Sequence, residues 1–154
     1  MSKSKALLRF GALLLVALLS LMFAACRTQP LANPAPVVAA ASLAETRVAI
    51  LRALLTNNWQ LESERPGEIV TSYSRSDWKM TVEIAYSNEI SIRYLRSENL
   101  GYEASPADGP IIHKGYNARV NRLAKLIQSE ITIARVTVNL PPVAAPPPGE
   151  VQAD

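Results

Sequence analysis

The chain has 154 residues, enough for one domain of ordinary size with a tail at each end. Three of its 16 Lys and Arg residues precede the first apolar run, so a chain beginning at Cys26 has 13 basic and 13 acidic residues, a balance that argues against a nucleic-acid partner. With one Cys and one His, an intramolecular disulfide is excluded and no metal or other cofactor is expected.

Residues 1–25 have the pattern of a secretory signal peptide. Positive charges lie within the first nine residues, an uncharged run of 14 residues extends from Phe10 to Phe23, and the small residues Ala24 and Ala25 follow. The apolar run is short for a membrane-spanning helix, which needs about 20 residues. Two alternatives stay open, namely an ordinary signal peptide followed by a leftover cysteine, and an uncleaved membrane anchor.

The ending Ala24-Ala25-Cys26 resembles the lipobox of bacterial lipoproteins, although Phe23 stands where that pattern usually has an aliphatic residue. The resemblance implies that Cys26 is the lipid attachment site and the mature amino terminus. Each buried CH₂ of an acyl chain contributes about 0.8 kcal/mol, so two or three chains would hold the protein firmly to a membrane. Arg27, in place of an Asp after the cysteine, implies by the same resemblance an outer-membrane location facing the periplasm.

Proline-rich segments flank the expected domain, which spans residues 43–140. We interpret residues 26–42 as the lipidated cysteine and a flexible tether, because the stretch from Gln29 to Ala41 has three prolines and no charge. In an extended conformation it could hold the domain up to roughly 40 Å from the bilayer. Residues 141–154 contain five prolines and are predicted to be a disordered tail, with a ligand for an aromatic groove as the alternative.

The first helix of the domain is predicted to begin at Ser42, because Ser42-Leu43-Ala44-Glu45 has the spacing of a capping box. Its expected buried stripe consists of Ala44, Val48, Leu51 and Leu55, widened by Ile50 and Leu54. We expect the helix to end at the pair Asn57-Asn58, since asparagine tolerates left-handed backbone conformations.

Four strands are predicted next, over residues 59–64, 69–74, 78–86 and 89–97. The third has the clearest alternation, with Trp78, Met80, Val82, Ile84 and Tyr86 on one face. The short connections allow only antiparallel neighbours, so the strands should form a meander.

A second amphipathic helix is predicted from the spacing of Tyr116, Val120, Leu123, Ile127 and Ile131. The β-branched residues that follow leave open whether the helix ends before Arg135. The predicted fold class is α+β. After the signal peptide and tether, a four-stranded antiparallel meander sheet is covered on one face by the two helices, in the order α-β-β-β-β-α.

The candidate binding residues are Arg93, Tyr102, His113, Tyr116 and Asn117, which could converge where the last strand leads into the second helix. Such a set can bind a carboxylate or a sugar through directional hydrogen bonds. The competing interpretation is that His113 and Asn117 fix the loop and the helix start while Tyr116 packs in the core.

Enzymatic motifs are lacking. Glu62 and Glu64 are expected on one strand face about 7 Å apart, a spacing of cooperating carboxylates that a solvated sheet edge also explains. No serine lies in a Gly-x-Ser-x-Gly elbow and there is no glycine-rich phosphate loop. We therefore expect no catalytic residues and no enzymatic activity.

Three stretches, NNWQLESERPGEIV, VEIAYSNEISIRYLRSENLGY and IHKGYNARVNRL, resemble small uncharacterised lipoproteins of Gram-negative bacteria across about residues 44–130. Arg119 and Arg122 depart from that pattern, which would have Trp and Asn there. The resemblance implies fold and location but no activity. We expect a membrane-anchored envelope protein that binds another envelope protein or a cell-wall component, with a small hydrolase or transferase using the His113 region, or a purely structural accessory, as alternatives.

Overall fold

The computed structural model of the protein describes residues 28–40, 42–104 and 107–138. The predicted signal peptide, the lipid attachment at Cys26 and the proline-rich tail lie outside these residues and stay predictions.

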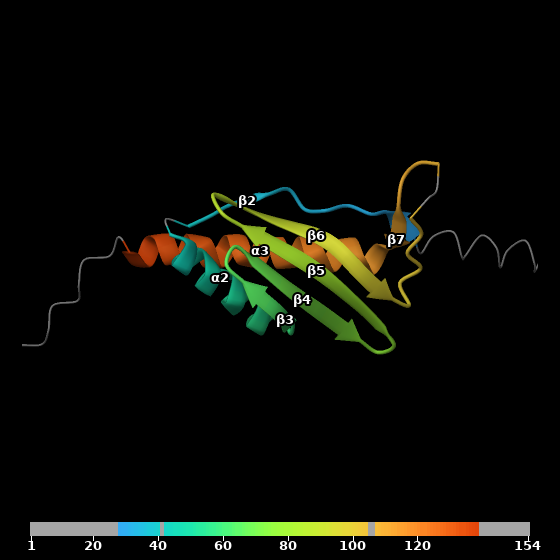
Figure 1. Ribbon diagram of the computed structural model, residues 1–154, viewed down its shortest axis with the longest axis horizontal. Helices are drawn as coiled ribbons and strands as arrows, with labels where there is room; N and C mark the ends of the chain where they lie inside the picture. Colours follow the sequence, from blue (N-terminus) through green and yellow to red (C-terminus); the bar gives the residue numbers. More distant parts are fainter. Residues whose placement is uncertain (1–27, 41, 105–106, 139–154) are drawn as a thin grey trace, which may run out of the picture.

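The described chain forms one main sheet, a small second sheet and two helices (Figure 1). In chain order the elements are β1 (Thr28–Pro30), β2 (Val37–Val38), α2 (Leu43–Thr56), β3 (Gln60–Arg65), β4 (Glu68–Arg75), β5 (Trp78–Tyr86), β6 (Glu89–Glu98), β7 (Ile111–His113) and α3 (Lys114–Val138).

The main sheet has the strand order β2-β6-β5-β4-β3, and every pair in it is antiparallel. Both helices lie behind the same face of this sheet (Figure 1). The predicted α+β class and the meander from β3 to β6 are therefore confirmed. The predicted strand number of four is wrong, because β2 adds a fifth strand at the β6 edge.

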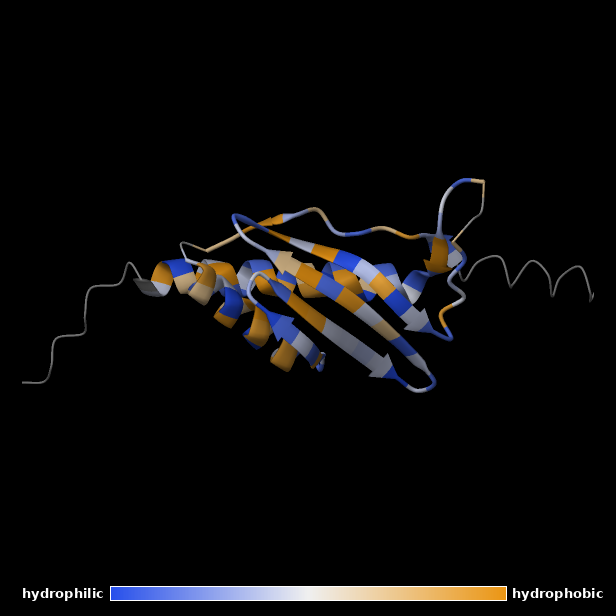
Figure 2. Cartoon of the chain, viewed as in Figure 1, coloured by the Kyte–Doolittle hydropathy of each residue, from blue (hydrophilic) through white to orange (hydrophobic). Residues whose placement is uncertain are grey.

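The core lies between the sheet and the helices, and the alternation of β5 creates the sheet's share of it. Met80, Val82 and Ile84 have no exposed surface, whereas Lys79 and Glu83 point to the other face. Hydrophobic and hydrophilic residues alternate along the strands in Figure 2. One buried face and one polar face are what an antiparallel sheet covered on a single side requires.

Helix α2 begins at the predicted capping box, in which Ser42 Oγ accepts from the backbone N–H of Glu45 and the Glu45 carboxylate accepts from the backbone N–H of Ser42. Its predicted buried stripe is only partly right. The buried residues are Thr46, Ala49, Ile50, Ala53 and Leu54, whereas Val48 and Leu55 are exposed. The small side chains of Ala49 and Ala53 allow close packing, and the Thr46 hydroxyl is satisfied because it donates to the Ser42 carbonyl.

Helix α3 buries the stripe that its sequence predicts. Tyr116, Val120, Leu123, Ile127 and Ile131 all have no exposed surface. The helix continues past Arg135 to Val138 and has 25 residues, so it is about 37 Å long and spans the domain from one end to the other (Figure 1).

Residues 28–40 do not form the predicted tether, because they lie along the domain. β1 pairs with β7, and β2 pairs with β6 at Ile90 and Glu89. Val37 and Ala39 are buried in the core. The prolines exclude a helix here, but an extended segment can still lie beside a sheet edge where other elements satisfy its polar backbone atoms. The domain therefore includes Thr28 rather than beginning at residue 43.

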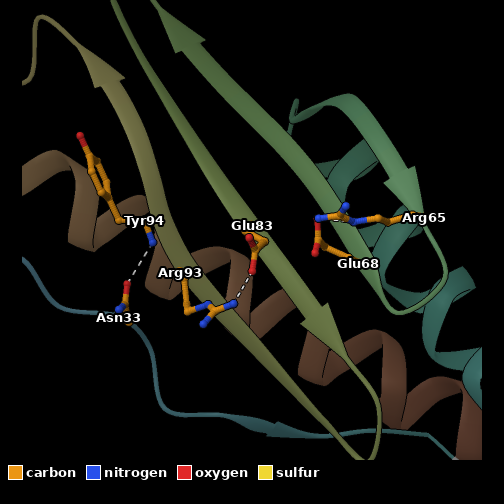
Figure 3. Close-up of polar contacts among 6 residues, drawn as sticks. All are labelled: Asn33, Arg65, Glu68, Glu83, Arg93 and Tyr94. Carbon is orange, nitrogen blue, oxygen red and sulfur yellow. Dashed lines mark hydrogen bonds and ion pairs between the residues drawn. The ribbon is translucent and has the colours of Figure 1, made fainter.

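Side chains from the rest of the domain also hold this segment. The Asn33 carboxamide oxygen accepts from the Tyr94 backbone N–H (Figure 3), and Arg135 donates to the carbonyl of Ala39. The backbone N–H of Ala40 donates to the Thr46 hydroxyl. β1, which pairs with β7, lies at the end of the domain where α3 begins, and the last turns of α3 lie at the opposite end (Figure 1).

Candidate functional site

Arg93 lies apart from the other predicted binding residues. It is on the face of the sheet away from the helices, where its guanidinium pairs with Glu83 of β5 (Figure 3). This ion pair raises the pKa of Arg93. An exposed pair of this kind contributes little to stability. Because Glu83 already neutralises the guanidinium, Arg93 is less suited to bind an anionic ligand.

Tyr102 and Tyr116 belong to an aromatic cluster around Tyr94. The rings of Tyr94 and Tyr102 stack with centroids 4.5 Å apart, and Tyr116 meets Tyr94 edge-on at 5.5 Å. Tyr116 is fully buried, and its hydroxyl has no hydrogen-bond partner among the described residues. Burial raises the pKa of the Tyr116 phenol, and the neighbouring Tyr94 adds to the rise. Tyr116 is thus a core residue, with a phenol that stays protonated.

His113 and Asn117 hold backbone in place. His113 Nδ1 accepts a hydrogen bond of 3.0 Å from the N–H of Gly115, at the start of α3. The Asn117 side chain bonds the N-terminal segment twice, because its Nδ2 donates to the Pro30 carbonyl at 2.8 Å and its Oδ1 accepts from the Ala32 N–H at 3.1 Å. Both side chains serve contacts within the fold.

Four of the five predicted residues therefore lie near β7 and the start of α3, and Arg93 does not join them. The contacts that the structure gives His113, Tyr116 and Asn117 match the structural interpretation of this region. The sequence did not indicate that their main partner is the segment from residue 28 to residue 40.

Glu62 and Glu64 do not share a face as predicted. A bulge between Leu61 and Ser63 breaks the alternation of β3. Glu62 pairs with Lys79 and Arg96 on the face away from the helices. Glu64 instead pairs with Arg47 of α2. Because a bulge inserts one unpaired residue, it reverses the facing of those that follow it. Each carboxylate has its own basic partner, so the two form no catalytic pair.

A cavity of about 330 Å³ at the start of α3 has three arginines and no acidic residue in its lining. Its lining consists of Arg75, Trp78, Gly115, Ala118, Arg119 and Arg122. Arg75 comes from the end of β4, and the other two arginines come from one face of α3. The meander brings the β4–β5 turn to the amino-terminal end of α3 (Figure 1), which unites residues more than 40 positions apart.

Aromatic rings support this arginine cavity. Tyr73 lies between Trp59 and Trp78, with ring centroids 5.5 and 5.7 Å away, and the guanidinium carbon of Arg119 is 4.2 Å from the Tyr73 centroid. A cation over an aromatic face is attracted by the negative charge of the ring's π system. The stacking fixes Arg119 in position without neutralising its charge.

The cavity is positively charged without compensation from the described chain. None of its three arginines forms an ion pair with a described carboxylate. Asp77 is in the same turn as Arg75, but it too makes no ion pair with any of the three. From Lys114 to Lys125, α3 has four basic residues and no acidic one. Like charges three or four positions apart on a helix repel each other, as Arg119 and Arg122 do here. An anion bound in the cavity would relieve the repulsion.

The sequence interpretation missed this site. In the sequence, Arg119 and Arg122 are distinguished only as departures from the resembled lipoproteins. The signal that could have found them was the run of basic residues without an acid at the expected start of a helix. Arg75 could not have been added from the sequence, because its proximity depends on the sheet.

Other kinds of site find less support in the part of the chain that the structure describes. There, no three His, Cys, Asp or Glu residues gather closely enough to hold a metal ion. Neither described helix combines the length and hydrophobicity that crossing a bilayer demands. A second cavity of about 330 Å³ lies between α2 and the end of α3, and Val48 and Thr137 are among its lining residues. It is less charged than the arginine cavity.

Comparisons with known proteins gave no match to a family model, to a curated protein or to a solved structure. The resemblance to small Gram-negative lipoproteins therefore stays a prediction from the sequence.

Proposed function

We propose that this protein is a lipid-anchored protein of the bacterial envelope that acts by binding an anionic group in the arginine cavity, without catalysing a reaction. The observation that supports binding is the cavity itself, where Arg75, Arg119 and Arg122 have no described carboxylate partner. Arginine presents donors in a planar fork that matches phosphate and carboxylate oxygens. The lipid anchor at Cys26 and the outer-membrane location rest on the amino-terminal sequence.

The alternative of a small hydrolase or transferase in the His113 region has weaker support. His113 accepts from the Gly115 backbone, Asn117 bonds two backbone groups, and the Tyr116 hydroxyl is buried. A general base must take up a substrate proton, and the Nδ1 of His113, which would have to do so, already accepts from Gly115.

Anion binding is testable by titrating the purified protein with inorganic phosphate while following the side-chain Nε–H signals of its arginines by NMR. We expect the signals of Arg75, Arg119 and Arg122 to shift together, with a dissociation constant in the millimolar range. The double substitution Arg75→Gln/Arg122→Gln should weaken binding about tenfold or more, since it removes two charge-assisted contacts.

Arg52→Gln is the matched control, because Arg52 is also an exposed helical arginine without a described ion pair but lies outside the cavity. Equal shifts for Arg52 and the cavity arginines would refute the site. The anchor has its own test, in which Cys26→Ala abolishes metabolic lipid labelling and releases the domain from the membrane. Labelling that survives this substitution would refute lipidation at Cys26.

A further inference from the structure

We propose that the anionic group held in the arginine cavity is the headgroup phosphate of a phospholipid in the membrane that holds the Cys26 anchor. This inference rests on the proposed function, because it combines lipidation at Cys26 with anion binding in the cavity. It adds the source of the anion and the orientation of the domain on the membrane.

The chain between the anchor and the domain is short. Only Arg27 separates Cys26 from Thr28. Two residues of extended chain span at most about 7 Å, so the anchor must enter the membrane close to Thr28. A flexible tether would have allowed the domain any orientation and about 40 Å of clearance. With residues 28–40 packed along the domain, that freedom is lost.

Thr28 is at the same end of the domain as the arginine cavity. Thr28 pairs with His113 in the β1–β7 sheet, and Gly115, two residues further along the chain, lines the cavity. The β4–β5 turn that carries Arg75 lies at the same end of the domain (Figure 1). The anchor therefore draws the arginine cavity, rather than the far end of α3, toward the bilayer.

That end of the domain is basic and aromatic, as a membrane-facing surface should be. Arg75, Arg119 and Arg122 are joined there by Lys114 at the start of α3. Each basic residue close to an anionic bilayer raises membrane affinity by about fivefold, and the attraction acts within a Debye length. Trp78 lines the cavity half-buried, and Tyr102, which follows the end of β6, is 40% exposed. Tryptophan and tyrosine are the residues enriched where a membrane meets water.

The test uses the native reporter Trp78. The chain has two tryptophans, so Trp59→Phe leaves Trp78 as the only one. The full chain is reconstituted into vesicles of phosphatidylcholine, with or without phosphatidylglycerol, that contain a lipid with a nitroxide on its headgroup. We expect strong quenching of Trp78 fluorescence that increases with phosphatidylglycerol and decreases with added salt.

Variants separate cavity docking from simple proximity to the anchor. Arg75→Gln/Arg122→Gln should lower the ratio of docked to undocked domain about 25-fold in phosphatidylglycerol vesicles, at about fivefold per arginine. Arg52→Gln should leave quenching unchanged. Arg119 is kept, because its contact with Tyr73 contributes to the fold.

Two contrary outcomes are distinguishable. If the cavity arginines respond to inorganic phosphate in solution but Trp78 quenching depends on neither phosphatidylglycerol nor the two arginines, the anion site stands and the phospholipid source is refuted. If the arginines respond to neither phosphate nor vesicles, the anion site and this inference both fail.

Discussion

The substitution Asn117→Ala tests whether residues 28–40 belong to the domain. Asn117 is 8% exposed and provides two hydrogen bonds to this segment, to the Pro30 carbonyl and from the Ala32 N–H. At about 0.5–1.5 kcal/mol for each bond, alanine should weaken docking of the segment by about 1–3 kcal/mol. Because α3 is helical whether or not the segment is docked, the helix propensity of alanine does not change this cost. The expected loss is about 1–3 kcal/mol, a factor of about 5–150 in the opening equilibrium.

Hydrogen–deuterium exchange measures this opening directly. Exchange in the peptide covering residues 28–40 should accelerate by that factor in Asn117→Ala, while the amides of β5 keep their protection. Asn121→Ala is the matched control, because Asn121 lies one turn further along α3 and is exposed. Rapid exchange of the peptide in the unchanged protein, or equal acceleration in the two variants, would refute the docking of this segment.

Three further predictions concern single side chains. Glu62→Gln should make stability less sensitive to acid, because a hydrogen bond from Lys79 lowers the pKa of Glu62 below its ordinary 4.5. The stability that this bond provides is lost as pH falls through the lowered pKa. Equal stability of the variant and the unchanged protein at every acid pH would show that the bond does not stabilise the fold. Tyr116→Phe should leave the melting temperature unchanged or higher, because the buried hydroxyl has no hydrogen-bond partner among the described residues. It should also reduce the loss of stability above pH 10, where the phenol ionises in the unfolded chain but not in the fold. A large drop in melting temperature would reveal a partner for the hydroxyl. Gly115→Ala should lower the free energy of unfolding by about 1 kcal/mol despite alanine's helix propensity, since its Cβ would lie 2.9 Å from His113 Nδ1. A higher melting temperature of the variant would contradict that crowding.

Local periodicity predicted most of the secondary structure. β5 and α3 each have one unambiguous apolar face, so alternation in one and helical spacing in the other identified the buried residues. The capping box likewise depends on residues three positions apart. In α2 the sequence offers two overlapping apolar faces, and packing against α3 selects the one with Ala49 and Ala53.

Features that depend on distant contacts could not be predicted in this way. Residues 28–40 have the composition of a linker, and their place in the domain follows from acceptors and donors near β6 and α3. The bulge in β3 leaves no mark in the alternation of residues 59–64, so the faces of Glu62 and Glu64 were misassigned. The arginine cavity joins Arg75 to α3 only through the sheet.

The central claim is that the end of the domain with the arginine cavity faces the membrane. β5 connects the two ends, since Asp77 precedes it and Ser87 follows it, and its nine residues separate them by about 30 Å. Cys26 is the only cysteine in the sequence, so Asp77→Cys and Ser87→Cys each introduce one new thiol for a nitroxide label, with the unchanged chain as background. In vesicles containing a nickel-chelating lipid, electron paramagnetic resonance should show strong relaxation enhancement for the label at residue 77 and little for the label at residue 87. Equal enhancement at both positions, or a larger effect at residue 87, would contradict the account.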